Sequence, residues 1–116
     1  MVTIALTVDG ISFSATLGDT RAASELAQRL PLTLDMAELN GNEKYCYLDD
    51  PLSVDSSRVG TIHTGDIMLF GDDCLVLFYE TFATGYSYTR IGRIDDPMGF
   101  AEALGTGSVI VSFEAK

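Results

Sequence analysis

Two apolar runs meet at one turn in the stretch Asp66-Ile-Met-Leu-Phe70-Gly-Asp-Asp-Cys74-Leu-Val-Leu-Phe-Tyr79. Both runs are apolar at odd and at even positions, whereas a strand with one face in water would alternate. The Gly-Asp-Asp cluster between them is typical of a hairpin turn. The stretch therefore predicts a β-hairpin with protein on both of its faces, and we expect the core to be built on it.

Further strands are predicted on both sides of this central hairpin, because apolar and polar residues alternate there with a period of two. Gly92 lies inside one of these runs, where a glycine marks a bulge or the close approach of another backbone. The predicted strands cover residues 2–8, 11–17, 32–36, 44–48, 88–94 and 108–113.

Two short amphipathic helices are predicted between the strands. The first covers 21–30, with Asp19 or Thr20 as its N-cap and a proline directly after it. The second covers 98–104, where an Asp-Pro pair precedes the first turn and a glycine follows the last.

Residues 49–58 and 81–87 show no periodicity and are expected to form surface loops. Outside these loops, the sequence predicts roughly eight short, mostly meandering strands and two helices. This order predicts a mostly β protein, a closed eight-stranded antiparallel barrel with two short capping helices. We expect one domain over residues 1–116.

Four motifs support a family resemblance. They are Leu30-Pro-Leu-Thr-Leu-Asp-Met36, Leu39-Asn-Gly-Asn-Glu-Lys-Tyr45, Gly60-x4-Gly65-Asp-Ile67 and Ile91-Gly-Arg-Ile94. With the order of elements, they resemble the cyclophilin-type barrel, and more narrowly the small bacterial and archaeal cyclophilin-like proteins of unassigned function. The resemblance implies the fold of the prolyl isomerases without implying a settled activity.

The chain departs from the catalytic cyclophilins at the residues that the resemblance makes important. In those enzymes the strand after the first helix carries a catalytic arginine, whereas this chain has Leu34-Asp-Met-Ala-Glu38 there. The tryptophan of their binding pocket is also missing, since the chain contains none. Whether the protein is an enzyme stays uncertain, and the departures weigh against inherited isomerase activity.

Composition excludes some partners and indicates a compartment. Seventeen acidic against seven basic residues give a net charge of −10, which disfavours nucleic acids and anionic membranes. No apolar run is long enough to cross a bilayer and no signal sequence is evident, so we expect a cytoplasmic protein, and the family resemblance implies a bacterial one. Cys46 and Cys74 lack a Cys-x-x-Cys spacing, and no metal or cofactor is expected.

The residues most able to bind a ligand follow the central hairpin. Tyr79, Tyr86, Tyr88 and Arg90 lie close together in the sequence, and Tyr88 and Arg90 fall on one strand face. Arginine beside tyrosines can bind a carboxylate or a peptide carbonyl. The leading prediction is a binding module with a shallow cleft lined by these four residues, for a small anionic ligand or an extended peptide.

Alternatives remain open for the same residues. His63 is the only histidine, so the chain could be a divergent peptidyl-prolyl cis-trans isomerase, or a lyase or hydrolase that uses it. A third alternative is self-association through a strand edge at 109–113, and the oligomeric state is unknown. In the simplest interpretation, Arg90 forms an internal ion pair, His63 is a solvated turn residue and the paired aspartates serve turns and helix caps.

Overall fold

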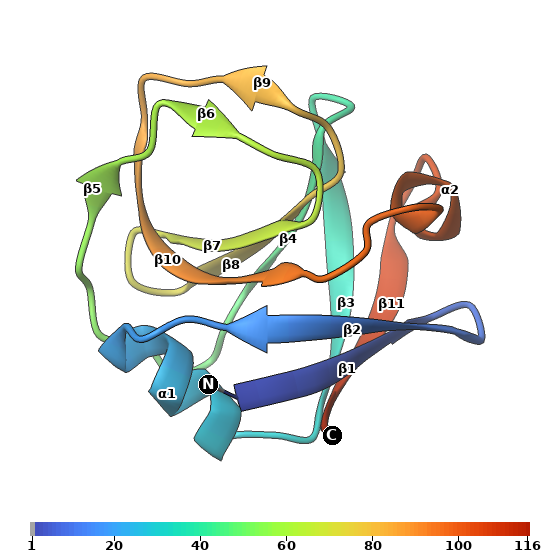
Figure 1. Cartoon of the computed structure of the whole chain (residues 1–116), viewed down its shortest axis with the longest axis horizontal. Helices are drawn as coiled ribbons and strands as arrows, with labels where there is room; N and C mark the ends of the chain where they lie inside the picture. Colours follow the sequence, from blue (N-terminus) through green and yellow to red (C-terminus); the bar gives the residue numbers. More distant parts are fainter. Residues whose placement is uncertain (1) are drawn as a thin grey trace.

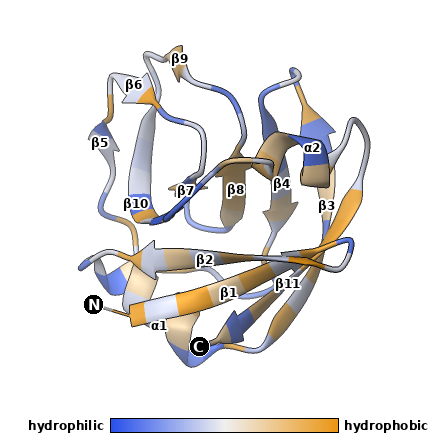
Figure 2. Ribbon diagram, turned by 45° about the vertical axis from the view of Figure 1, so that its right-hand side comes forward, coloured by the Kyte–Doolittle hydropathy of each residue, from blue (hydrophilic) through white to orange (hydrophobic). Residues whose placement is uncertain are grey.

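The central hairpin predicted from the sequence is confirmed. In the computed structural model, which describes residues 2–116, β7 (Asp66–Phe70) pairs in antiparallel register with β8 (Cys74–Phe78) (Figure 1). Every residue of β8 is buried, and Figure 2 shows this strand as hydrophobic along its length. One face packs into the main core through Leu75 and Leu77, and the other into a second cluster through Val76 and Phe78.

The hairpin belongs to a closed barrel of eight antiparallel strands, so the predicted architecture is confirmed. The strands follow one another around the barrel in the order β2-β1-β11-β3-β4-β8-β7-β10, and β10 pairs with β2 to close it. The remaining six strands are β1 (Val2–Val8), β2 (Ile11–Leu17), β3 (Leu32–Leu39), β4 (Glu43–Tyr47), β10 (Ser87–Ile94) and β11 (Val109–Ala115).

Gly92 makes the closure possible. The pairing of β10 with β7 shifts register between Arg90 and Gly92, and Gly92 lies opposite Leu17 of β2. A Cβ atom at this position would lie 2.4 Å from the carbonyl oxygen of Thr16, which is inside van der Waals contact. The bulge and the close backbone approach predicted at this glycine are both present.

The two helices bury side chains in the main core. Helix α1 (Arg21–Gln28) begins at Thr20, whose hydroxyl oxygen accepts the backbone N–H of Ala23 at 3.2 Å. It ends at Gln28, two residues short of the prediction, and packs with Leu26 fully buried. Helix α2 (Phe100–Leu104) lies at another part of the barrel rim and buries Phe100 and Leu104 (Figure 1).

The predicted start of the second helix, at residue 98, is wrong. Asp96 accepts the N–H of Met98 at 3.2 Å in a side-chain turn, and Gly99 follows with φ of 80°. A residue in the left-handed region cannot continue a right-handed helix, so α2 begins at Phe100. Gly105, with φ of 73°, ends the helix as predicted.

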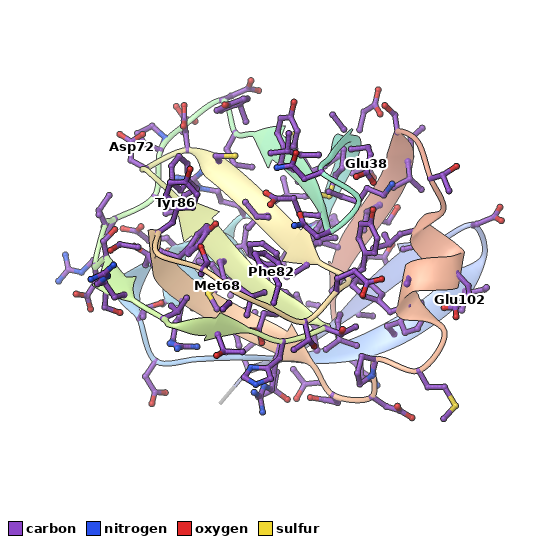
Figure 3. The ribbon with its side chains drawn as sticks, turned by 90° about the horizontal axis from the view of Figure 1, so that it is seen from above. Glu38, Met68, Asp72, Phe82, Tyr86 and Glu102 are labelled. Carbon is purple, nitrogen blue, oxygen red and sulfur yellow. The ribbon has the colours of Figure 1, made fainter. Side chains whose placement is uncertain are left out.

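An outer layer of three short strands lies against one side of the barrel (Figure 1). It consists of β5 (Ser57–Arg58), β6 (Thr61–Ile62) and β9 (Phe82–Ala83). β6 pairs with β9, and Ile62 and Phe82 cover Met68 and Phe78 of the central hairpin. Figure 3 shows Met68 and Phe82 together on this face. The loop predicted over 81–87 therefore contains a strand.

Two other expectations need correction. The segment 49–58 is not simply a surface loop, because Leu52 keeps 3% exposure and joins the main core, while β5 occupies its last two residues. β11 offers no free edge for self-association over 109–113, because it pairs with β1 on one side and with β3 on the other. Self-association through this strand edge is therefore not available in the closed barrel.

Candidate functional site

The outer layer packs over Met68 and Phe78 on the outer face of the central hairpin. Val76 and Cys74 lie on the same face and form the floor of a cleft of about 440 Å³. We call this the aromatic cleft, because five of its ten lining residues are aromatic. The lining consists of Leu39, Asn40, Glu43, Tyr45, Tyr47, Phe70, Cys74, Val76, Tyr86 and Tyr88.

Strand register explains why these residues meet. β4 pairs with β8 so that Tyr45 lies opposite Val76 and Tyr47 opposite Cys74. Phe70 of β7 lies opposite Cys74 from the other side. Because side chains alternate between the two faces of a strand, all of them point away from the barrel interior. The cleft is thus a property of the outer face of the barrel.

The walls of the cleft expose an unusual amount of apolar surface. Tyr47 and Tyr86 are each 65% exposed, Phe70 46% and Leu39 43%, and these are four of the nine large hydrophobic side chains exposed in residues 2–116. Phe70 contacts Tyr86 edge to face at 6.0 Å between ring centroids and Tyr88 at 5.7 Å. Clustered exposed apolar side chains are characteristic of interaction sites in folded proteins, so this cleft is the candidate functional site.

Glu43 is the one ionisable carboxyl in the lining. Its side chain is partly buried, and it makes no hydrogen bond or ion pair with any residue of the described chain 2–116. Burial, and secondarily the negative charge of Glu38, raise the pKa of Glu43 above its ordinary value of 4.5. A partly desolvated carboxylate without a partner would gain from a cation or a hydrogen-bond donor in the cleft.

The thiol in the floor is not prepared for nucleophilic chemistry. Burial, together with the charges of Glu43 and Asp73, raises the pKa of Cys74 to about 11, so the thiol is protonated at neutral pH. Burial also raises the pKa of Tyr88. Over residues 2–116, the lining includes no lysine, arginine or histidine. The arrangement is suited to binding through aromatic rings, hydroxyl groups and one carboxyl group.

Of the residues predicted to form one cleft, the structure brings two together. Tyr86 and Tyr88 line the aromatic cleft, whereas Tyr79 and Arg90 do not. Tyr79 directly follows β8 and continues the inward-facing positions of Leu75 and Leu77, so it packs against the main core and not in the cleft. It contacts Glu38, which Figure 3 places well away from Tyr86.

Tyr79 belongs to a buried polar network at the end of β4. The ammonium group of Lys44, which is fully buried, donates to Glu38 at 2.8 Å and to the carbonyl oxygens of Gly105 and Gly107 at 2.9 and 2.6 Å. The Tyr79 hydroxyl donates to the same carboxylate oxygen of Glu38 at 2.6 Å.

The charges of this network set the pKa values of its members. Burial alone would raise the pKa of Glu38, but hydrogen bonds from Lys44, Tyr79 and the Gly41 N–H outweigh it and lower that pKa. Burial, and then the bond to Glu38, raise the pKa of Tyr79 to about 12. The hydrogen bonds therefore favour the charged form of the Glu38 carboxyl group, and the network joins the segment after α2 to the barrel.

Arg90 and His63 lie outside the aromatic cleft. Arg90 is exposed and lines a separate depression with Arg93, Asp66 and Asp95. Arg90 lies on the outer face of β10 opposite Met68. On that face it is the next side chain after Tyr88, two residues away in the sequence. His63 is 61% exposed, and its Nδ1 atom lies 3.9 Å from Oδ2 of Asp66, beyond hydrogen-bond distance.

Eight of the ten lining residues were not predicted as site residues, and four of these carry an aromatic ring or a carboxyl group: Glu43, Tyr45, Tyr47 and Phe70. Each lies in or beside a predicted strand. Its apolar or charged side chain at an outward-facing position was the feature of the sequence that could have indicated it. Their convergence depends on the pairing of β4 with β8, which are separated by β5, β6 and β7 along the chain. No group of three or more His, Cys, Asp or Glu side chains suited to a metal ion occurs in the described part of the chain.

The closed eight-stranded barrel is the architecture that the family resemblance implied. A family model described as "Cyclophilin-like family" matches residues 6–114, so the chain belongs to the cyclophilin-like family, as the sequence motifs predicted. No curated protein and no solved structure matches the chain. Among residues 2–116, none of the helices has the length and apolar character needed to span a bilayer.

Proposed function

We propose that this cyclophilin-like protein is a binding module that holds an extended peptide segment in the aromatic cleft. The observation that carries the proposal is the convergence of exposed apolar side chains on one concave surface, built from five strands of a rigid barrel. Folded proteins rarely leave such side chains clustered in water without a partner.

The chemistry of the lining favours a peptide over a small anion. Tyrosine rings contact apolar and planar groups, and their hydroxyls can bond to peptide N–H and C=O groups. The volume of about 440 Å³ is within the range of ligand sites and suits a few residues of an extended chain. The cation expected to attract an anion, Arg90, lies in another depression beside two carboxylates.

The proposal can be tested by selecting random peptides displayed on phage against the immobilised wild-type protein. Selected peptides are then titrated against Tyr86→Ala and Phe70→Ala, two changes at exposed positions that should leave the fold intact. Each variant is expected to weaken binding roughly tenfold or more, since aromatic side chains at the centre of an interface contribute about 1–2 kcal/mol or more.

Ile110→Ala is the matched control, because Ile110 is 61% exposed on β11 and does not line the cleft. Its affinity for the peptides should equal that of the wild type. Peptides that bind all three variants as tightly as the wild type would show that the cleft is not the binding site.

A further inference from the structure

Resting on the proposed function, we infer that the peptide bound in the aromatic cleft is basic and inserts a lysine or arginine side chain between the rings. The inference comes from three independent properties of the site: an unpaired carboxyl group, rings placed to contact a cation, and the sign of the surrounding charge.

The first property is the state of Glu43. Its carboxyl group lies partly buried at the cleft wall and forms no hydrogen bond or ion pair within residues 2–116. The carboxylate of Glu38, which is also partly buried, is occupied by Lys44, Tyr79 and the Gly41 N–H. Glu43 is thus free to pair with an incoming cation, and a charge-assisted hydrogen bond to it would be stronger than a neutral one.

The second property is the arrangement of the rings. Tyr45 and Tyr47 stand on β4 with centroids 5.9 Å apart, while Phe70, Tyr86 and Tyr88 gather on the other side of the floor. A cation held within about 6 Å of several ring faces is attracted by each of them, and the attraction grows when water is excluded. The aliphatic part of a lysine or arginine side chain would contact Val76 and Cys74 in the floor.

The third property is the charge around the cleft. No basic residue among 2–116 lines it, and Asp73 lies close enough to Cys74 to influence the pKa of its thiol. The chain as a whole carries a net charge of −10. This field attracts basic peptides, repels acidic ones, and opposes the approach of a second copy of the same chain.

The test compares three blocked pentapeptides of the form acetyl-Gly-Gly-X-Gly-Gly-amide, in which X is lysine, norleucine or glutamate. Norleucine has an aliphatic side chain like that of lysine without the ammonium group. Binding to the wild-type protein is followed by amide chemical shifts in two-dimensional NMR, up to millimolar peptide. We expect the lysine peptide to shift the cleft residues and to bind about tenfold more tightly than the norleucine peptide.

Glu43→Gln is the decisive variant, because it removes the charge while keeping the size of the side chain. The preference for lysine over norleucine should fall to about twofold, the part that the rings alone provide. Glu114→Gln, an exposed change on β11 outside the cleft, should keep the wild-type preference. The carboxyl signal of Glu43 should also titrate at lower pH when the lysine peptide is bound.

The outcomes separate this inference from the proposed function. Equal or tighter binding of norleucine by the wild type would overturn the basic-peptide inference and leave a cleft that binds apolar peptides. Failure of all three peptides to shift cleft residues would overturn both. A sedimentation coefficient that rises with protein concentration, together with broadened signals in the cleft, would assign the surface to a second copy and also overturn the inference.

Discussion

Replacing Lys44 by methionine should destabilise the protein more than its position near a strand end suggests. The ammonium group is fully buried and donates to Glu38, Gly105 and Gly107. Methionine fills nearly the same space and donates nothing. The two carbonyl oxygens then lose a donor in the interior, and the Glu38 carboxylate loses its counter-charge.

The magnitude follows from the burial of the two partners. Removing one member of a buried ion pair costs about 3–5 kcal/mol, because the other charge stays uncompensated. The side chain of Glu38 keeps 23% exposure, so water can solvate it in part, and the lower end of this range, about 3 kcal/mol, is expected. At roughly 4 °C per kcal/mol for a chain of this size, Tm should fall by about 12 °C.

Urea and thermal unfolding followed by circular dichroism would measure this effect in Lys44→Met, Glu38→Gln and the double variant. The double variant should lose less stability than the sum of the single ones, with a coupling of about 1–2 kcal/mol. Arg21→Met is the control, since Arg21 is exposed at the start of α1, and its effect should stay within about 0.5 kcal/mol. A Lys44→Met protein as stable as the wild type, or additive single effects, would contradict the assignment of this network as a stabilising element.

Three further predictions concern stability. Gly92→Ala should lower the free energy of unfolding by about 2–3 kcal/mol, because its Cβ atom would collide with the backbone of β2. Gly107→Ala is the control, since a Cβ atom there meets open space and the free energy of unfolding should change little. Urea unfolding measures both variants. The pKa of Glu38 is lowered on folding, and this contributes stability that is fully present above pH 4.5 and is lost as the pH falls through the lowered pKa. The Tm of Glu38→Gln should therefore fall less steeply toward acidic pH than the Tm of the wild type. The pKa of Glu43 is raised on folding, so its negative charge disfavours the folded state at neutral pH. Glu43→Gln should therefore have a higher Tm than the wild type at pH 7, and the difference in Tm should be smaller at pH 4. A lower Tm of the variant at pH 7 would refute the account of its burial.

The parts of the fold that follow from local chemistry were predictable. The doubly apolar pattern of β7 and β8 requires protein on both faces, and the structure provides the barrel interior on one side and the outer layer on the other. Gly92 was recognisable because a glycine in a strand needs a reason, and the reason is the nearby backbone of β2. These features depend on the residue itself and its neighbours along the chain.

Features that depend on side-chain turns or on distant pairing were not predictable from the pattern. Asp96 draws Met98 into a turn and Gly99 takes a left-handed conformation, so the second helix begins two residues later than its apolar spacing suggests. The outer strands β6 and β9 have only two residues each, too few for a period to be seen. Their partners come from segments about twenty residues apart.

The candidate site shows the same division. Tyr86 and Tyr88 were predicted because aromatic residues gather in one part of the sequence, and both line the cleft. Tyr79 is a near neighbour in the chain, but it lies on the inward-facing side of the strand with Leu75 and Leu77 and contacts Glu38. Glu43, which distinguishes the site chemically, reaches the cleft only through strand register, because β4 lies beside β8 in the barrel. Sequence proximity was a useful guide on one strand and no guide across strands.

The closure of the barrel has a consequence for how the protein is made. β1 and β2 pair with each other, but their other partners come from near the opposite end of the chain, since Ile4 pairs with Ala115 and Leu17 with Gly92. During synthesis on the ribosome, β1 and β2 emerge early, and the outer edges of this hairpin stay unpaired until β10 and β11 are synthesised. Chains whose pairings are this distant fold in milliseconds to seconds rather than microseconds. Variants that slow the pairing of β10 and β11 with the first hairpin should therefore aggregate during expression, even where the structure and stability of the folded protein are unchanged.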